Sequence, residues 1–534
     1  MTSLISHPVT DRTTLEALDW RVGRHRSPRR RLESRHRRRI RAVLTSPWPW
    51  LAVIATAQVI LSRVVPRNDG AFQDEGLYIY MGHRVLDLVR SGEPLFESPG
   101  SYFSGAPAFY PVLAALVDSV GGLQAARDLS LVFLIVTMGA TYGLGKQLFG
   151  RLAGLLGAAA FAVNGPVIYL SQWATFDSMT LMLAALAAWL AVVSAKSEGL
   201  LRAPFVAMLL VAAVFAKYAG AMFVPIVAAL AVAAGWSRFG WLVVRRAAFL
   251  VAASVTLFFF IVLLWGRGML DGLAQTTTER HILNPTGQLE LATQAATWIG
   301  PWLALALLGG ILRLRRQPMV VLVLLGGSVL GPLQQIHLGE GTSLSKHVAF
   351  GLIFAAPLIG ALLSTVLQVR AVLLRALLAP AVLALVCALA ALGLQHSGRF
   401  LTAYPEDTQF REYLREAVAA NPGKPILAEQ SSAQRYELRD MTEPWQWADT
   451  YVFKYKGLTG PAAYERAIRE RYFGVIYLNF TTKNSHQIVK FLGNSPVNGN
   501  YYHLAAQVPG YIHGDPAGFW LMWTPQSKRY TYIP

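Results

Sequence analysis

The chain has 534 residues, of which 54% are hydrophobic and only 15% are charged. Soluble globular proteins carry about 25% charged residues, so the composition excludes a monomeric soluble enzyme and indicates a membrane protein. The single cysteine, Cys387, excludes an intramolecular disulfide framework and a cysteine-based zinc site. The net charge of +18 would suggest nucleic-acid binding in a soluble protein, but in a membrane protein it reports which side each loop occupies.

The first 47 residues are polar and basic, with twelve arginines and four acidic residues. We interpret residues 1–47 as a solvated cytoplasmic tail that fixes the topology. Contact with anionic lipid headgroups is the functional alternative, and a nucleic-acid partner is not expected. The charged region is too long for a cleavable signal peptide.

Apolar runs follow, and we predict about eleven helices in a membrane domain over residues 48–394. Several runs are close to the ~20 residues that span a bilayer. The helices are expected at residues 48–65, 129–149, 152–170, 179–195, 201–217, 219–235, 241–265, 298–312, 319–336, 348–367 and 372–394.

The charges of the loops alternate with the predicted spans. With the N-terminus inside, the cytoplasmic loops carry twelve basic residues against Glu198 alone, whereas the opposite side has nine basic and thirteen acidic residues between positions 63 and 346. This is the positive-inside pattern. An odd number of spans then places residues 395–534 outside the cytoplasm, and the protein is expected in the plasma (inner) membrane.

Residues 395–534 have the composition of a soluble domain. Short strands are predicted at 425–428, 473–480, 501–506 and 519–524, and an amphipathic helix at 461–472. The fold class is therefore a mainly α polytopic membrane protein with a small C-terminal α/β domain outside the membrane.

Acidic residues flank two spans on the outer side. Adjacent carboxylates such as Asp74 and Glu75 can supply a general base or hold a divalent metal ion, or they belong to an ordinary polar loop. Asp177 stands at the outer start of a helix, where an aspartate also serves as an N-cap.

Cationic and polar residues are expected on the same side. Each lysine or arginine could instead reach for lipid headgroups, and Arg127 could form a structural ion pair, but ionisable residues at membrane depth favour a functional site. The cation candidates are Arg127, Lys217, Arg280 and Lys346, and the further candidates for substrate contact are Tyr78, Tyr218, His281, His337, Glu340 and His347.

Carboxylates and cations together suit glycosyl transfer from a lipid-phosphate sugar. A hydroxyl acceptor needs a base, and a departing phosphate needs positive charge where its negative charge develops.

Motifs in this region resemble those of the GT-C superfamily, in the group of protein O-mannosyltransferases and lipid A aminoarabinose transferases. The resemblance lies in order from about residue 63 to 190 and more weakly to 367. It rests on the segments DEGLY at 74–78, APAFYPVL at 106–113, ARDLS at 126–130, LGKQLFGR at 144–151 and TFDS at 175–178. Residue 112 is valine where the family usually has a second proline.

The resemblance implies an inverting glycosyltransferase that uses a polyprenyl-phosphate sugar. Asp74 would be the general base, Glu75 would orient it or the acceptor, and Asp177 would position the acceptor or the first loop. Arg127, Lys217, Arg280 and Lys346 would bind the donor phosphate. The expected partners are the polyprenyl-phosphate donor, membrane lipids, and a glycan, lipid or protein acceptor.

Two other classes of function remain open. One is a membrane transporter or lipid flippase with an extracytoplasmic domain, although the interior helices carry few charges. The other is a non-catalytic assembly or binding protein. The sequence leaves open the sugar, the acceptor and the need for a metal ion.

Overall fold

A computed structural model describes residues 46–67, 69–198, 202–265, 268–276, 279, 285–450, 453–480, 501–525 and 531–532. The chain divides into residues 1–52 and residues 53–534, and the C-terminal sheet and all described candidate site residues belong to the second unit. The basic tail and the candidates Arg280 and His281 lie outside the described residues.

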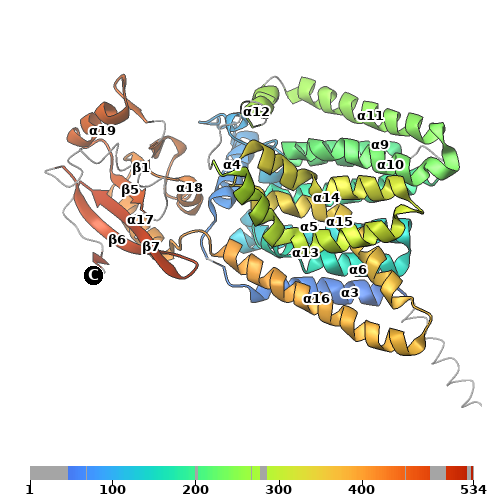
Figure 1. The fold of residues 1–534 in the computed structure, drawn as a ribbon. Coiled ribbons are helices and arrows are strands. Elements are labelled where there is room, and N and C mark those ends of the chain that lie inside the picture. Colours follow the sequence, from blue (N-terminus) through green and yellow to red (C-terminus); the bar gives the residue numbers. More distant parts are fainter. Residues whose placement is uncertain are drawn as a thin grey trace, which may run out of the picture. The chain divides into compact units, whose positions relative to one another are not determined.

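Apolar helices form the larger part of the structure (Figure 1). Within the described ranges, eight helical segments are long and apolar enough to cross a membrane, and three apolar helices are shorter. The long ones are α5 (Tyr110–Phe149), α8 (Phe176–Ala195), α10 (Phe223–Phe239) with η2 (Tyr218–Met222), α11 (Trp241–Trp265), α13 (Gln288–Leu314), α14 (Pro318–Leu338), α15 (Leu344–Leu367) and α16 (Val372–Leu401). The shorter ones are α3 (Trp48–Val64), α6 (Arg151–Ala162) and α9 (Ala203–Ala216), and α7 (Gly165–Leu170) follows α6. The predicted helical membrane fold is confirmed.

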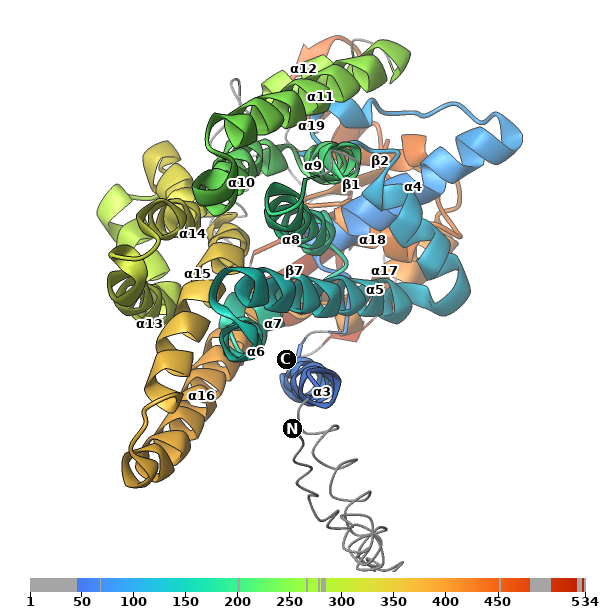
Figure 2. The same cartoon turned by 90° about the vertical axis from the view of Figure 1, so that its right-hand side faces the viewer.

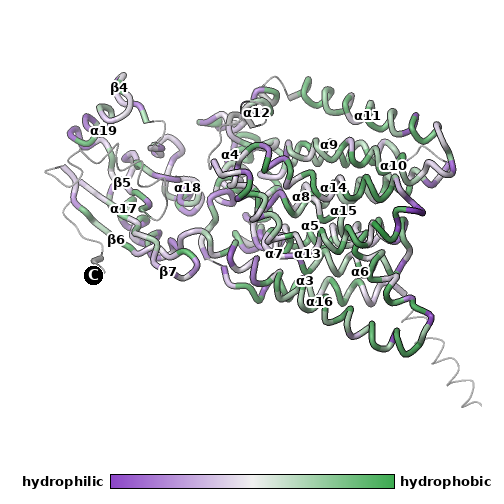
Figure 3. The backbone as a smooth tube through the Cα atoms, in the orientation of Figure 1, coloured by the Kyte–Doolittle hydropathy of each residue, from purple (hydrophilic) through white to green (hydrophobic). Residues whose placement is uncertain are grey.

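Helix α15 is the most enclosed of these helices and α16 the least. In their most apolar windows, 78% of the residues of α15 are buried but only 17% of those of α16. Leu373 of α16 is 83% exposed and Leu263 of α11 is 81% exposed. Lipid tails are as apolar as leucine, so such side chains lose nothing by facing hydrocarbon. Figure 3 shows the hydropathy of each residue along the backbone of these helices. Helix α15 lies beside α13 and α14 (Figure 2).

The long segment between the first two predicted spans is largely helical. It contains α4 (Gln73–Ser91), the 3-10 turn η1 (Pro99–Ser101) and the first part of α5, which is kinked at Gly122, where φ is 68°. Helix α4 was not predicted because polar and charged residues at both of its ends keep its average hydropathy low.

The C-terminal domain has the predicted α/β composition. The strands β1 (Ile426–Ala428), β5 (Val475–Asn479), β6 (His503–Ile512) and β7 (Asp515–Thr524) and the helix α19 (Gly460–Arg469) confirm the predicted elements. Further elements of this domain are α17 (Thr408–Ala420), α18 (Ser432–Glu437), η3 (Pro444–Gln446), β2 (Trp447–Asp449), β3 (Lys454–Tyr455), β4 (Leu458–Thr459) and β8 (Thr531–Tyr532). The short helix α12 (Gly268–Thr276) lies outside this domain, between α11 and α13 in the sequence.

The main sheet has the order β2-β1-β5-β7-β6-β8. Strand β1 runs parallel to β2 and β5, and β7 pairs antiparallel with β5 and β6. Along β5, Tyr477 belongs to the hydrophobic cluster with Phe410 of α17, while Ile476 belongs to the cluster with Tyr464 of α19. Because successive side chains point to opposite faces, a strand covered on both faces is apolar throughout.

Candidate active site

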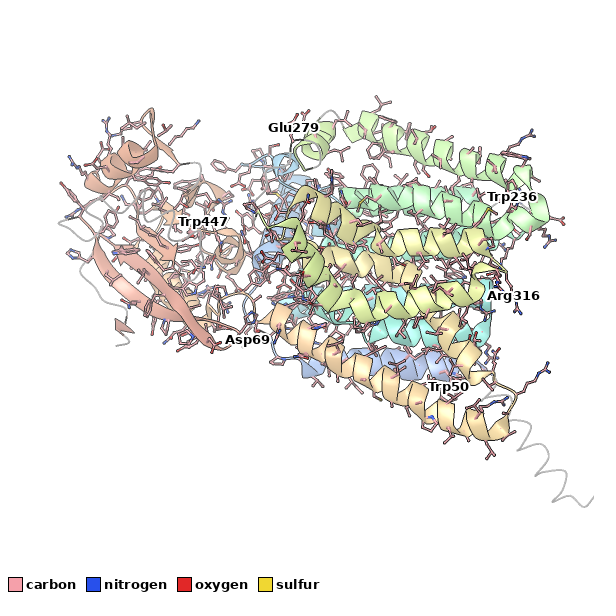
Figure 4. The ribbon with its side chains drawn as sticks, in the orientation of Figure 1. Trp50, Asp69, Trp236, Glu279, Arg316 and Trp447 are labelled. Atoms are coloured by element: carbon pink, nitrogen blue, oxygen red, sulfur yellow. The ribbon has the colours of Figure 1, made fainter. Side chains whose placement is uncertain are left out.

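Helix α4 presents Asp74 and Glu75 in its first turn, where the helix dipole favours negative charge. The Phe72 backbone N–H donates to Oε2 of Glu75 at 2.9 Å, which satisfies one of the unpaired donors at the helix start. The segment that leads into α4 contains Asp69. Figure 4 shows Asp69 at one end of the helices and Trp236 and Arg316 at the opposite end.

Glu75 forms a buried ion pair with Arg127 of α5. The Arg127 Nε and Nη2 atoms donate to the two carboxylate oxygens at 2.9 and 2.7 Å, and the side chains are 3% and 0% exposed for Arg127 and Glu75. Glu75 also accepts the backbone N–H of Ala174 at 2.7 Å, and Arg127 donates to the Gly70 carbonyl at 2.8 Å. This pair therefore fastens the start of α4 to α5 and to the segment before α8.

Asp74 is bound by a different cation, Lys346. Lys346 lies in the first turn of α15 and is almost fully buried, whereas the Asp74 side chain is 30% exposed. The ammonium group also lies over the ring of Phe72, 5.3 Å from its centroid. Asp74 thus combines a fixed position with access from outside, as a group that meets a substrate requires.

Asp177 and Lys217 form a second acid–lysine pair at 2.5 Å, and both side chains are buried. Lys217 stands at the break between α9 and η2, where its extended backbone interrupts the helix. Within the described part of the chain, Oδ2 of Asp177 has no hydrogen-bond partner. A buried carboxylate oxygen without a partner is costly, so this atom is suited to receive a substrate hydroxyl.

The two acid–lysine pairs belong to one electrostatic cluster. Lys346 interacts with Asp177 as well as with Asp74, and Lys217 interacts with Asp74 as well as with Asp177. The ring of Phe176 lies 5.2 Å from the Lys217 ammonium. Two lysines and two aspartates, from α4, α8, α15 and the break between α9 and η2, therefore share one site, which we call the acid–lysine cluster.

Tyr78 lies one turn after Asp74 and packs against Phe176, with ring centroids 4.3 Å apart. Burial, and to a smaller extent the Asp74 charge, raise the pKa of Tyr78 well above the usual value of tyrosine. The phenol therefore keeps its proton and can serve as a hydrogen-bond donor beside the cluster.

Of the remaining predicted substrate contacts, His347 interacts with the acid–lysine cluster, whereas Tyr218 and Glu340 have other partners. His347 is buried, its Nδ1 lies 2.5 Å from Nε2 of Gln335, and it interacts electrostatically with Asp177. The Tyr218 N–H donates to the Ser104 carbonyl at 2.7 Å, which docks the Lys217 break on the segment before α5. Glu340 is buried and accepts the Thr342 N–H at 2.9 Å.

His337 ends α14 with an exposed side chain. No contact between it and the acid–lysine cluster is found in the described residues. Its predicted role as a substrate contact therefore gains no support from the geometry.

The phenylalanine and tryptophan residues of the site were not predicted. Phe72 and Phe176 lie beside the two lysines, and Trp173 lies beside Arg127, 5.1 Å from its guanidinium carbon. Their signal in the sequence is their place next to the candidate acids, since Phe72 precedes Asp74 by two positions and Phe176 precedes Asp177. Aromatic faces stabilise buried cations.

The residues fit a divalent metal ion poorly. Among the described residues no group of three His, Cys, Asp or Glu side chains is placed to hold a metal ion. Each aspartate of the cluster faces a lysine, whose positive charge opposes a second cation at the same oxygens.

The fold of this chain is similar to those of solved structures of ArnT and of an oligosaccharyltransferase. ArnT from Cupriavidus metallidurans bound to undecaprenyl phosphate is similar to this chain, with a TM-score of 0.59 and 12% identity over 90% of this chain and 99% of ArnT. The oligosaccharyltransferase of Archaeoglobus fulgidus in the apo form is also similar, with a TM-score of 0.58 and 10% identity over 91% of this chain and 76% of that protein.

A third similar structure is the oligosaccharyltransferase AglB from Archaeoglobus fulgidus in complex with an inhibitory peptide and a dolichol-phosphate. Its TM-score is 0.55, with 11% identity over 90% of this chain and 74% of AglB. No protein-family model and no curated protein matches the sequence. At these identities the similarity establishes the fold, and the predicted GT-C architecture is confirmed.

Proposed function

We propose that this protein is an inverting glycosyltransferase that moves a sugar from a polyprenyl phosphate to a hydroxyl acceptor at the outer face of the membrane. The observation that carries the proposal is the acid–lysine cluster, in which Asp74 and Asp177 share the field of Lys217 and Lys346. The similar structures of ArnT and AglB, with undecaprenyl phosphate and dolichol-phosphate, support a lipid-phosphate donor.

Asp74 is the proposed general base. It accepts the proton of the acceptor hydroxyl while the acceptor oxygen forms a bond to C1 of the sugar. Its partial exposure admits the acceptor, and its ion pair with Lys346 holds the carboxylate in place. Attack on the face of C1 opposite the phosphate inverts the anomeric centre.

Lys217 and Lys346 are the proposed ligands of the leaving phosphate. As the bond between C1 and the phosphate oxygen breaks, its electron pair remains on the phosphate, and nearby ammonium groups stabilise the added negative charge. Arg127 ranks below these lysines because its bonds to Glu75 and Gly70 hold it at the contact between α4 and α5, whereas both lysines belong to the acid–lysine cluster.

Asp177 is the proposed positioning residue for the acceptor. Its Oδ1 holds Lys217, and its Oδ2 is left for a second hydroxyl of the acceptor. Glu75 is a proposed positioning residue for Asp74, because its ion pair with Arg127 fixes the first turn of α4.

The loop charges support an outer location for the site. The basic loops, with Arg316 among them, lie at the end of the bundle opposite Asp69, and basic loops favour the cytoplasm. The N-terminus would then be cytoplasmic and the C-terminal domain extracytoplasmic. Arginine outnumbers lysine 38 to 10, a bias common in GC-rich bacterial genomes, which favours a cell-envelope glycan, glycolipid or secreted protein as acceptor.

The full-length protein in nanodiscs, incubated with a panel of synthetic polyprenyl-phosphate sugars and envelope extract, tests the proposal. We expect release of free polyprenyl phosphate and a glycosylated product whose anomeric configuration, measured by NMR, is opposite to that of the donor. Substrate-dependent flux in liposomes with no covalent product would instead favour a transporter or flippase and overturn the proposal.

A further inference from the structure

The segment of residues 70–72, which leads into α4, lies between the membrane bundle and the C-terminal domain. On the bundle side, Arg127 donates to the Gly70 carbonyl at 2.8 Å. On the other side, the Ala71 N–H donates to Oε1 of Glu437 at 3.3 Å. The same oxygen lies 2.9 Å from Nη1 of Arg411 in α17. The segment is therefore held by charged groups from both parts of the chain.

Gly70 fits closely against this part of the C-terminal domain. A Cβ atom added at Gly70 would lie 2.5 Å from Oδ1 of Asp407 and 3.1 Å from Nη2 of Arg411. Asp407 in turn lies 3.0 Å from Nε of Arg411 and accepts a hydrogen bond from Gln434 of α18 at 3.0 Å. Residues 407, 411 and 437 thus form one ion-pair chain over the segment.

Helix α18 continues the contact along α4. A Cβ atom at Gly76 would lie 2.6 Å from the Ser432 carbonyl and 2.7 Å from Cα of Ala433, so α18 and α4 meet backbone to backbone. Ala433 and Tyr436 belong to the same buried cluster as Tyr78.

A second polar contact lies further along the same helices. The Tyr436 hydroxyl donates to Asp118 of α5 at 2.5 Å, and Arg439 donates to the same carboxylate at 3.0 Å. Nε2 of His83 in α4 lies 2.7 Å from it. The Asp118 side chain is fully buried, so this carboxylate joins α4, α5 and the residues around α18.

We propose that Glu437, Arg411 and Asp407 are positioning residues that fix Asp74 through residues 70–72. The inference rests on the proposed function, because it assigns the C-terminal domain a part in the same site. Asp74 follows Gly70 by four positions, the Phe72 N–H between them is bonded to Glu75, and Lys346 holds the Asp74 carboxylate from the other side. A displacement of about 1 Å in a reacting group can lower the rate by about 100-fold.

The test compares Glu437→Ala with the conservative Glu437→Gln in the full-length protein. Alanine removes both the acceptor for the Ala71 N–H and the partner of Arg411, whereas glutamine keeps the acceptor. We expect Glu437→Ala to lower kcat by about 10- to 100-fold with little change in the donor KM, and Glu437→Gln to recover part of the loss. Glu465→Gln, which breaks an exposed ion pair with Arg469 of α19, is the matched control and should leave kcat unchanged.

Hydrogen exchange of residues 70–76, measured by mass spectrometry, gives a readout that does not depend on activity. Exchange should become faster in Glu437→Ala and stay unchanged in Glu465→Gln. If Glu437→Ala does not fold, Gly70→Ala serves the same purpose, because its added methyl group displaces the segment from Asp407. A wild-type protein without transferase activity would refute the proposed function, whereas an active wild type with unchanged kcat and exchange in the variants would refute the positioning role.

Discussion

Lys346 and Asp74 form an ion pair although 272 positions separate them in the sequence. The contact joins the first turn of α15 to the first turn of α4, so both charges lie at helix N-termini. A carboxylate is favoured there and an ammonium group is not, which means that Lys346 depends on Asp74 for its stability. The partly exposed carboxylate of Asp74 and the buried ammonium group of Lys346 are thus coupled at the point where the proposed acceptor binds.

Replacing the proposed base, Asp74, should lower catalysis without preventing donor binding. We expect Asp74→Asn to lower turnover by about 100- to 10,000-fold, because amide nitrogen and oxygen cannot take the hydroxyl proton, while the protein still binds the polyprenyl-phosphate donor. Donor binding and single-turnover rates measure the two effects. Asp69→Asn, in the same segment, is the control, and near wild-type turnover in Asp74→Asn would remove the base assignment.

Breaking the buried pair Asp177–Lys217 should destabilise the protein. Lys217→Met leaves a buried carboxylate uncompensated, at a cost of about 3–5 kcal/mol, and also removes a proposed phosphate ligand. The double variant Asp177→Asn with Lys217→Met should regain much of the thermal stability but no activity. Thermal unfolding in detergent measures the first effect, and a double variant as unstable as the single one would contradict the explanation.

The neighbouring acids 74 and 75 should respond differently to the same change. Glu75→Gln leaves Arg127 buried with a half-satisfied partner, so we expect a loss of stability of about 3–5 kcal/mol. Asp74→Asn also removes the charged partner of Lys346, but we expect a smaller loss because the Asp74 side chain is 30% exposed and water screens that pair, whereas the Glu75 side chain is fully buried. Comparing melting temperatures of the two variants in one detergent tests this, and equal losses would contradict it.

Asp407 should make stability depend on pH. Burial raises the pKa of this carboxyl to about 6 from 3.8, against the opposing charge of Arg411 and with the added charges of Glu406 and Glu437. Between about pH 4 and 6 the unfolded chain has released this proton and the folded chain has not. The contribution of Asp407 to the free energy of unfolding is therefore fully present below about pH 4 and is lost as the pH rises through 6.

Asp407→Asn removes this titration and keeps a neutral side chain of the same shape. The melting temperature of the variant relative to wild type should therefore rise between about pH 4 and 6.5 and then level off. Asp440→Asn, at an exposed acid that pairs with Arg415, should show no such trend. A constant difference between Asp407→Asn and wild type would show that Asp407 does not titrate in this range.

The sequence by itself determined the membrane class, the apolar helices and the candidate acids. Apolar runs of sufficient length have no other stable state in a bilayer, and basic loops have a preferred side, so composition and charge were enough. The candidates Asp177, Lys217 and Lys346 could be named because each interrupts or borders an apolar span, where charge is costly. Asp74 could be named because it stands beside a second carboxylate, Glu75.

Only the tertiary structure decided which charges meet. Successive residues of a helix point about 100° apart, so Asp74 turns toward Lys346 while Glu75 turns toward Arg127, and nothing in the dipeptide itself distinguishes them. The same holds for Glu437 and Ala71, which lie 366 positions apart. Ion pairs and hydrogen bonds between distant segments arise from helix packing, and local sequence patterns do not encode that packing.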